Sequence, residues 1–159
     1  MTRLAISGHR GMQTPTEQLV TAELHKLVGD KGAGDLVGIS CLADGPDSIF
    51  AQEVLDAGGR LIAVIPAAKY RESLPDSHHQ FYDSLLDRAS ESVALEHSES
   101  DSEAHMDASL RMLDLADELI AVWDGRPARG YGGTADVVAA ANDKNIPVTI
   151  VWPAGATRD

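Results

Sequence analysis

The chain has 159 residues, of which 13 are Lys or Arg and 25 are Asp or Glu, and its formal net charge is −12. This length is typical of one domain with its own hydrophobic core, so we expect a single domain over residues 1–159. The negative charge makes nucleic acid an unfavourable partner, because it repels a phosphate backbone. The chain has one cysteine, Cys41, so an intramolecular disulfide is impossible. No run approaches the ~20 apolar residues of a membrane span, and we therefore expect a cytoplasmic protein without membrane contact.

Six short apolar runs predict β-strands. They are Leu4–Ile6, Leu36–Ile39, Leu61–Ile65, Val93–Leu95, Leu119–Trp123 and Val148–Trp152. Because these runs do not alternate polar with apolar residues, we expect both faces of each strand to be buried, as in a parallel sheet covered by helices.

Helical patterns fill the intervals between the runs. The first expected helix begins at Thr14. Four further helices are expected over Pro46–Ala57, Asp76–Arg88, Glu103–Leu115 and Ala135–Asn142. Thr14-Pro15-Thr16-Glu17 has the form of a capping box, and the acidic, Ser-rich segment Glu96–Glu103 predicts an exposed connection. Strands alternating with helices predict an α/β fold, a single doubly wound Rossmann-like domain with a mostly parallel sheet of about five to six strands, flanked by helices.

In open α/β sheets the ligand binds outside the carboxyl ends of the strands, so the loop after the first strand is a candidate site. Gly8 lets the backbone approach a ligand, His9 can donate a hydrogen bond or titrate, and Arg10 can form a bidentate pair with phosphate or carboxylate. The alternative is an ordinary tight turn with a solvated arginine.

The loop after the second strand carries carboxylates around Gly45. Asp44 or Asp47 can accept a hydrogen bond from a ribose hydroxyl, although Asp47 is equally placed to be the N-cap of the next helix. Cys41 is expected to be buried packing, since no histidine lies near it in the sequence.

The loop after the third strand holds Lys69, Tyr70 and Arg71, two cations and a ring that can stack on a base. An exposed basic loop is the alternative. Farther on, His78 and His79 are adjacent, and adjacent residues of a helix do not share a face, so we expect no metal site there.

The most informative loop follows Leu119–Trp123 and is rich in glycine. It includes Asp124, Arg126, Arg129, Gly130, Tyr131, Gly132, Gly133, Thr134 and Asp136. Glycines allow close backbone approach, Thr134 can cap the next helix, and the free N–H groups of that helix favour an anion. This pattern predicts a phosphate cradle, with a flexible turn as the alternative. It lacks the Walker Lys-Ser/Thr pair and the dinucleotide spacing, so it does not indicate ATP hydrolysis or NAD chemistry.

Three stretches resemble the SLOG superfamily, the Rossmann-like group that includes the LOG phosphoribohydrolases and the Smf/DprA DNA-processing proteins. They are Ile6–Arg10, Gly58–Pro66, and Ala116–Trp123 leading to Gly132-Gly133-Thr134. The resemblance implies a nucleotide or nucleotide-derived ligand, a sheet of this topology and a homodimer. The segment Leu42–Asp47 is similar to the helix-entry motif of the Smf/DprA branch.

The catalytic pattern of the LOG enzymes is not reproduced. In their Pro-Gly-Gly-x-Gly-Thr-x-x-Glu motif the glutamate position corresponds to Val137 here, and Asp136 lies one residue before it. The family arginine falls near Ala108, and Arg111 follows three residues later. Asp136 and Arg111 are therefore the candidate catalytic pair if the protein is an enzyme.

The leading hypothesis is a binding protein, sensor or carrier for a nucleotide or a nucleotide-like ligand such as a pterin-linked cofactor, with no cofactor required. Arg10 and the Gly132-Gly133-Thr134 helix start would hold the anion, Asp44 or Asp124 the ribose, and Tyr131 or Tyr70 the base. The alternatives are a phosphoribohydrolase that cleaves the N-glycosidic bond of a nucleoside monophosphate and, less favoured, a DNA-processing partner.

Two features of the acidic segment from residue 91 to 118 bear on partners. It contains nine acidic residues and one basic residue. Outside this segment, five bases lie in loops after strands and predict a cationic pocket: Arg10, Lys69, Arg71, Arg126 and Arg129. The helix of the acidic segment carries Met106, Leu110, Met112 and Leu113, which form either a dimer interface or part of the core.

Overall fold

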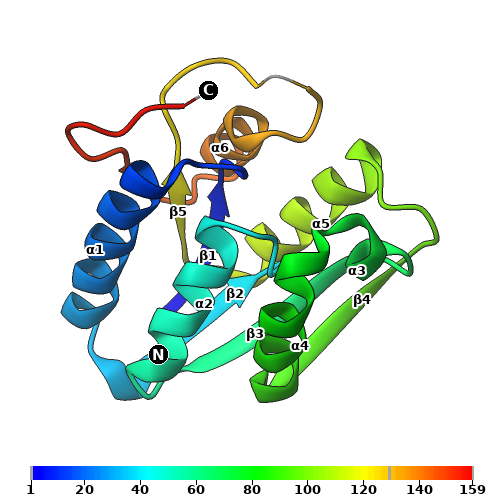
Figure 1. The fold of residues 1–159 in the computed structure, drawn as a ribbon, viewed down its shortest axis with the longest axis horizontal. Coiled ribbons are helices and arrows are strands. Elements are labelled where there is room, and N and C mark those ends of the chain that lie inside the picture. Colours follow the sequence, from blue (N-terminus) through cyan, green and yellow to red (C-terminus); the bar gives the residue numbers. More distant parts are fainter. Residues whose placement is uncertain (1, 129, 159) are drawn as a thin grey trace.

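A computed structural model describes residues 2–128 and 130–158, and these residues form one parallel sheet between two layers of helices (Figure 1). The strands are β1 (Thr2–Gly8), β2 (Leu36–Ser40), β3 (Arg60–Ala67), β4 (Glu91–His97), β5 (Glu118–Val122) and β6 (Val148–Val151). Their spatial order is β4-β3-β2-β1-β5-β6, and every neighbouring pair is parallel. The predicted doubly wound α/β fold is confirmed.

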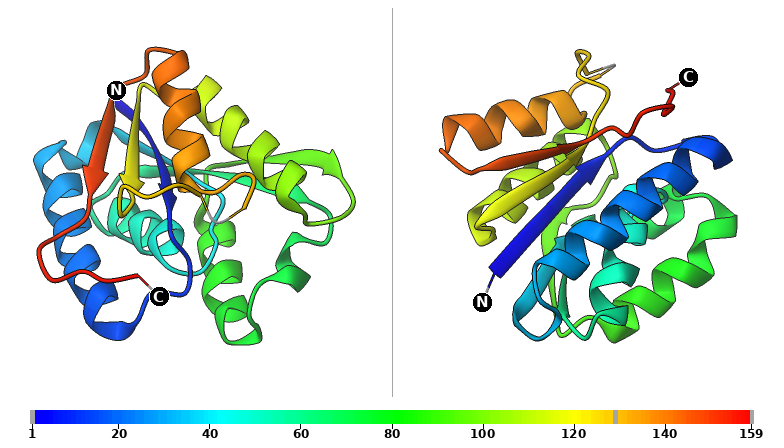
Figure 2. Two further views of the ribbon diagram at one scale, coloured as in Figure 1. Left: turned by 90° about the horizontal axis from the view of Figure 1, so that it is seen from above. Right: turned by 90° about the vertical axis from the view of Figure 1, so that its left-hand side faces the viewer.

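The helices lie on both faces of the sheet. They are α1 (Thr14–Asp30), α2 (Pro46–Asp56), α3 (Tyr70–Ser73), α4 (His79–Arg88), α5 (Ser102–Leu115) and α6 (Thr134–Asp143), with 3₁₀ turns at Ala33–Asp35 and Asp76–His78. Helices α1, α2 and α4 cover one face, and α5 and α6 cover the other (Figure 2). The helix expected over Asp76–Arg88 is divided, since its first three residues form the 3₁₀ turn.

Both faces of the central strand β1 are buried, as the continuous apolar runs predict. Leu4 and Ile6 pack with Leu24 of α1 and Phe50 of α2, whereas Ala5 joins the cluster on the other face. Burial of each large side chain contributes about 1.5–3 kcal/mol, so the two clusters fix the helices against the sheet.

The expected dimer face of α5 belongs largely to the core. Met106, Met112 and Leu113 are buried, and Leu110 is partly buried against the same cluster. These side chains therefore supply no free apolar surface, and the homodimer remains a prediction without this support.

Three predicted helix caps are wrong. The N-caps of α1, α2 and α6 are Gln13, Gly45 and Gly133, and none of the three forms a side-chain cap hydrogen bond. Thr14, Asp47 and Thr134 each lie one or two positions inside the helix. Thr16, inside the predicted capping box, donates its hydroxyl hydrogen bond to the carbonyl of Thr157. This is a tertiary contact, and neighbouring residues in the sequence do not predict it.

Helix α5 has the side-chain cap that the others lack. Asp101 Oδ1 accepts a hydrogen bond from the backbone N–H of Ala104 at 2.9 Å. The exposed connection expected over Glu96–Glu103 is shorter than predicted, because β4 continues to His97 and α5 begins at Ser102.

The strand order reverses at β1, which lies between β2 and β5. At such a switch point the loops from neighbouring strands turn to opposite faces and leave a crevice at the carboxyl edge. No helix in the described part of the chain combines the length and apolarity that crossing a bilayer requires.

Candidate functional site

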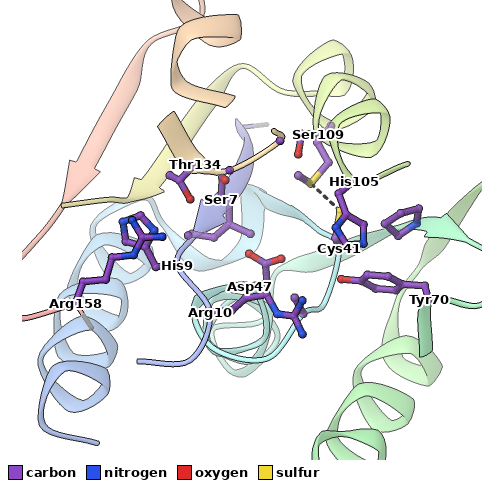
Figure 3. A pocket seen from close by; sticks show the side chains of 17 residues that line it. Ser7, His9, Arg10, Cys41, Asp47, Tyr70, His105, Ser109, Thr134 and Arg158 are labelled. Atoms are coloured by element: carbon purple, nitrogen blue, oxygen red, sulfur yellow. Dashed lines mark hydrogen bonds between the residues drawn. The ribbon is translucent and has the colours of Figure 1, made fainter. Parts of the chain in front are cut away.

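A pocket of about 300 Å³ opens at this crevice (Figure 3). Ile6–Gly8 of β1 form its floor together with Cys41, which follows β2. The start of α6 closes one side, and His105, Ser109 and Met112 of α5 contribute to the lining. The volume lies at the lower end of the range for small-molecule sites.

The Gly-rich loop delivers the start of α6 to the pocket. Gly132, Gly133 and Thr134 line it, and Gly132 has a φ of +86°, a conformation that favours glycine. The carboxylate of Asp136 accepts a hydrogen bond from the backbone N–H of Gly132 at 2.9 Å and holds the turn. Because the first N–H groups of a helix have no intrahelical acceptor, this start can bind an anion.

Close contact between two elements shapes the floor at Gly8. A Cβ at this position would lie 2.8 Å from two side-chain carbons of Pro46, the first residue of α2. Only glycine therefore lets the end of β1 lie directly against the start of α2, where Asp47 enters the pocket.

His9 is a buried structural element of the site. Its side chain packs edge-on against Trp152, with ring centroids 5.7 Å apart, and its Nε2 accepts a hydrogen bond from the backbone N–H of Asp124 at 3.1 Å. The same Nε2 lies 3.3 Å from Asp124 Oδ1. The ring thus ties the end of β1 to the loop after β5.

Two arginines line the pocket, and each is paired with a carboxylate. Arg10 donates from Nε and Nη2 to Asp44 Oδ1 at 2.9 and 2.7 Å, and Arg158 lies 3.6 Å from Asp124 Oδ2. Desolvation acts to raise the pKa of Asp124, but a hydrogen bond from the Arg126 backbone, with His9 and Arg158 nearby, lowers it below its usual range.

The remaining predicted cations point elsewhere. Lys69 pairs with Glu99 and Arg71 with Asp83, both at 2.8 Å and both exposed, and neither cation lines the pocket. The cationic character predicted from five loop bases is therefore carried, among the described residues, by Arg10 together with Arg158, which the sequence did not indicate.

The middle of the pocket and the end away from Arg158 hold groups that are costly to ionise (Figure 3). Burial raises the pKa of Asp47 to about 7, although a backbone hydrogen bond from Ala43 acts in the other direction. Burial also raises the pKa values of Cys41 and Tyr70 well above their ordinary values and, with Arg10 nearby, lowers that of His105. Each of these shifts favours the neutral form of its group.

The predicted ligand-binding residues separate into three groups. Those that line the pocket are Gly8, His9, Arg10, Gly132, Gly133 and Thr134. Three others do not line the pocket: Asp44, Gly45 and Asp124. Of these, Asp44 pairs with Arg10 and Asp124 with Arg158. Gly130 and Tyr131 are exposed on the loop, and Arg129 lies outside the described residues.

The candidate catalytic pair is not brought together in the pocket. Asp136 bonds the Gly132 backbone, and Arg111 is exposed on α5. Neither residue lines the cavity.

Several lining residues were not among the predicted site residues: Ser7, His105, Ser109 and Arg158. Asp47 and Tyr70, which the sequence offered as alternatives for the ribose and the base, also line the pocket. His105, Ser109 and Met112 recur at i, i+4 and i+7, so their shared helix face is visible in the sequence. Arg158 gives no such signal, because its position depends on the tail folding back to Thr16.

The two adjacent histidines have separate structural partners. His78 Nε2 contacts the hydroxyl of Ser48 at 3.1 Å and the carbonyl of Leu42 at 3.0 Å, and all three lie below the surface. His79 bonds the carbonyls of Arg71 and Leu74. The pair therefore stabilises the connection between β2, α3 and α4.

No family model and no curated protein matches the sequence. Solved structures do match. DNA processing protein A from Helicobacter pylori superposes with a TM-score of 0.71 at 16% identity, over 98% of this chain and 68% of that one. The molybdenum cofactor binding protein from Rippkaea orientalis gives 0.60 at 18% identity, over 94% and 75%. The Moco carrier protein from Chlamydomonas reinhardtii gives 0.59 at 16%, over 94% and 75%.

The predicted resemblance, which included the DNA-processing proteins, is confirmed at the level of the fold. Fold and site together define a Rossmann-like α/β protein with a pocket at its topological switch point.

Proposed function

We propose that the protein binds a phosphate-bearing nucleotide or a nucleotide-like cofactor, including a pterin-linked one, as a carrier or sensor. The observation that carries this proposal is the convergence of the α6 start, Arg10 and Arg158 on one pocket of about 300 Å³. A helix start supplies N–H donors, and an arginine supplies a charged planar fork, which together suit phosphate oxygens.

The fold neighbours support a carrier function. Two of them are described as a molybdenum cofactor binding protein and a Moco carrier protein. A carrier needs a site that encloses a ligand without breaking its bonds, and the candidate hydrolytic pair, Asp136 and Arg111, does not line this pocket.

Isothermal titration calorimetry with GMP, AMP and a phosphorylated pterin tests the proposal. Arg10→Gln should weaken binding of every phosphorylated ligand by about tenfold or more, because it removes a charge-assisted contact. Folding stability should change by only about 0.2–1 kcal/mol, since the Arg10–Asp44 pair is partly exposed to solvent.

Arg71→Gln is the matched control. Arg71 forms a similar exposed pair with Asp83 but does not line the pocket, so ligand affinity should be unchanged. If none of the three ligands binds at millimolar concentration, the proposal fails.

A DNA-processing function is the second candidate, favoured by the fold similarity to a DNA processing protein A with a single-stranded DNA binding mode. The net charge of −12 opposes it. Retention of single-stranded oligonucleotides in gels at low salt would support this second function, and free migration would exclude it.

A further inference from the structure

We infer that Asp47 recognises the edge that guanine and pterin rings share, on which a ring N–H lies beside the exocyclic 2-amino group, by accepting hydrogen bonds from these two adjacent donors. This inference rests on the proposed function and names the ring that accompanies the phosphate.

Asp47 lies between the two ends of the pocket. Figure 3 shows Thr134, His9 and Arg158 toward one end, Cys41, His105 and Tyr70 toward the other, and the Asp47 carboxylate in between. A ligand whose phosphate sits at the α6 start therefore extends its ring past Asp47.

The carboxylate of Asp47 has capacity for a ligand. Arg10, the nearby cation, directs Nε and Nη2 to Asp44 and acts on Asp47 only through space. A hydrogen bond from the Ala43 backbone reaches Asp47, but a carboxylate offers about four lone-pair sites on its two oxygens. Two parallel acceptors remain suited to a planar donor pair.

The surrounding walls suit a flat ring. Pro66, Tyr70 and Met112 line this part of the pocket, and Cys41 Sγ lies 3.8 Å from Met112 Sδ. Aromatic and thioether groups pack favourably against ring systems. Adenine places an acceptor at the corresponding ring nitrogen, and its lone pair would face the carboxylate, so this site disfavours it.

Burial disfavours the ionised form of the Asp47 carboxylate, and a pair of N–H donors from a ligand would offset that cost. The groups that act on Asp47 are the Ala43 backbone, Arg10 and Asp44, while Cys41 and Tyr70 respond to its charge. A ligand that donates two N–H groups to the ionised form should therefore bind more strongly as Asp47 loses its proton.

Calorimetry with GMP, IMP and AMP on the wild type and Asp47→Asn tests the inference at pH 8. GMP and IMP differ only in the 2-amino group, so their affinity ratio isolates one donor. We expect GMP to bind about tenfold to a hundredfold more tightly than IMP or AMP, and this preference to be lost in Asp47→Asn.

Two controls separate a ring contact from a general effect. Asp44→Asn should change GMP and IMP binding equally, because Asp44 holds Arg10 and does not line the pocket. The GMP/IMP ratio of the wild type should fall as the pH drops below about 7, while in Asp47→Asn it should stay flat. Taking a ratio cancels the titration of the phosphate itself.

A further arm distinguishes the two sources of the edge. Tighter binding of neopterin monophosphate than GMP assigns a pterin, and the reverse assigns guanine. A wild-type GMP/IMP ratio near one, or a preference retained by Asp47→Asn, overturns the inference and leaves the proposed function standing. No binding of any phosphorylated probe overturns both.

Discussion

Single carboxylates in this protein have different functions that depend on the atoms around them. Asp136 accepts a backbone hydrogen bond, Asp44 and Asp124 neutralise arginines, and Asp47 faces the cavity. Sequence position alone made Asp136 the catalytic candidate, whereas its contact assigns it to the shape of the Gly-rich turn.

Substitution of Asp136 should distinguish a shaping residue from a catalytic one. Asp136→Ala removes the acceptor for the Gly132 N–H and should lower the free energy of unfolding by about 1–2 kcal/mol. Asp136→Asn keeps an oxygen acceptor and should cost less than half as much. Urea unfolding measures both, and equal losses in the two variants would refute the assignment.

The thiol of Cys41 should be nearly unreactive in the folded protein. Burial, with Asp47 nearby, raises its pKa, and the thiolate is the reactive form. We expect reaction with Ellman's reagent at pH 8 to be at least about a hundredfold slower in the native protein than in denaturant. Fast native labelling would contradict the burial of this side chain.

At the scale of secondary structure, the helix starts differ in how they are stabilised. Helix α5 has a side-chain cap from Asp101, and the exposed Thr14 at the start of α1 forms none. The local sequence predicted a side-chain cap at Thr14 of α1, where none forms, and the structure has such a cap at Asp101 of α5.

The two positions provide a matched pair of substitutions. Asp101→Ala should reduce the free energy of unfolding by about 0.5–2 kcal/mol, the usual value of an N-cap. Thr14→Ala should change it by less than about 0.3 kcal/mol, because no cap hydrogen bond is lost. Chemical denaturation followed by circular dichroism checks both values, and a larger loss at Thr14 would restore the capping box.

The strands were predictable because burial on both faces requires a continuous run of apolar residues, and such a run can be recognised from residues that are adjacent in the sequence. The start of α6 at the pocket was predictable for a similar reason, since glycines and a helix signal are local. The positions of Arg158 and the Thr16 hydroxyl were not predictable, because their contacts join distant parts of the sequence. Thr16 bonds Thr157, 141 positions away, and Arg158 lies against Asp124 in the loop after β5. Tyr70 was predicted as a ring that can stack on a base, but its burial was not predictable, because it follows from packing against Tyr82 and His105.

For the molecule as a whole, the buried carboxyl of Asp47 should impose a pH dependence on folding. Its folded pKa is about 7, against 3.8 for the ordinary side chain, so between these values the folded protein binds more protons than the unfolded chain. Stability therefore falls as the pH rises through this window, by an upper limit of about 4 kcal/mol.

Asp47→Asn should remove this dependence. The variant should be more stable than the wild type at pH 8 by up to a few kcal/mol and close to it at pH 4, in urea unfolding series at fixed ionic strength. The difference between the two proteins cancels the titration of the other acidic residues. A constant difference across the window would place the pKa of Asp47 at its ordinary value.

The tail that brings Arg158 to the pocket also sets how the protein can be handled. Residue Thr2 begins β1 at the amino edge of the sheet, and Arg158 lies at the carboxyl edge, so the two ends of the described chain are on opposite sides (Figure 2). A fluorophore attached close to Arg158 would lie beside the pocket and compete with ligands. The same group attached close to Thr2 would lie at the opposite edge of the sheet, which makes that edge the place to immobilise the protein for binding measurements.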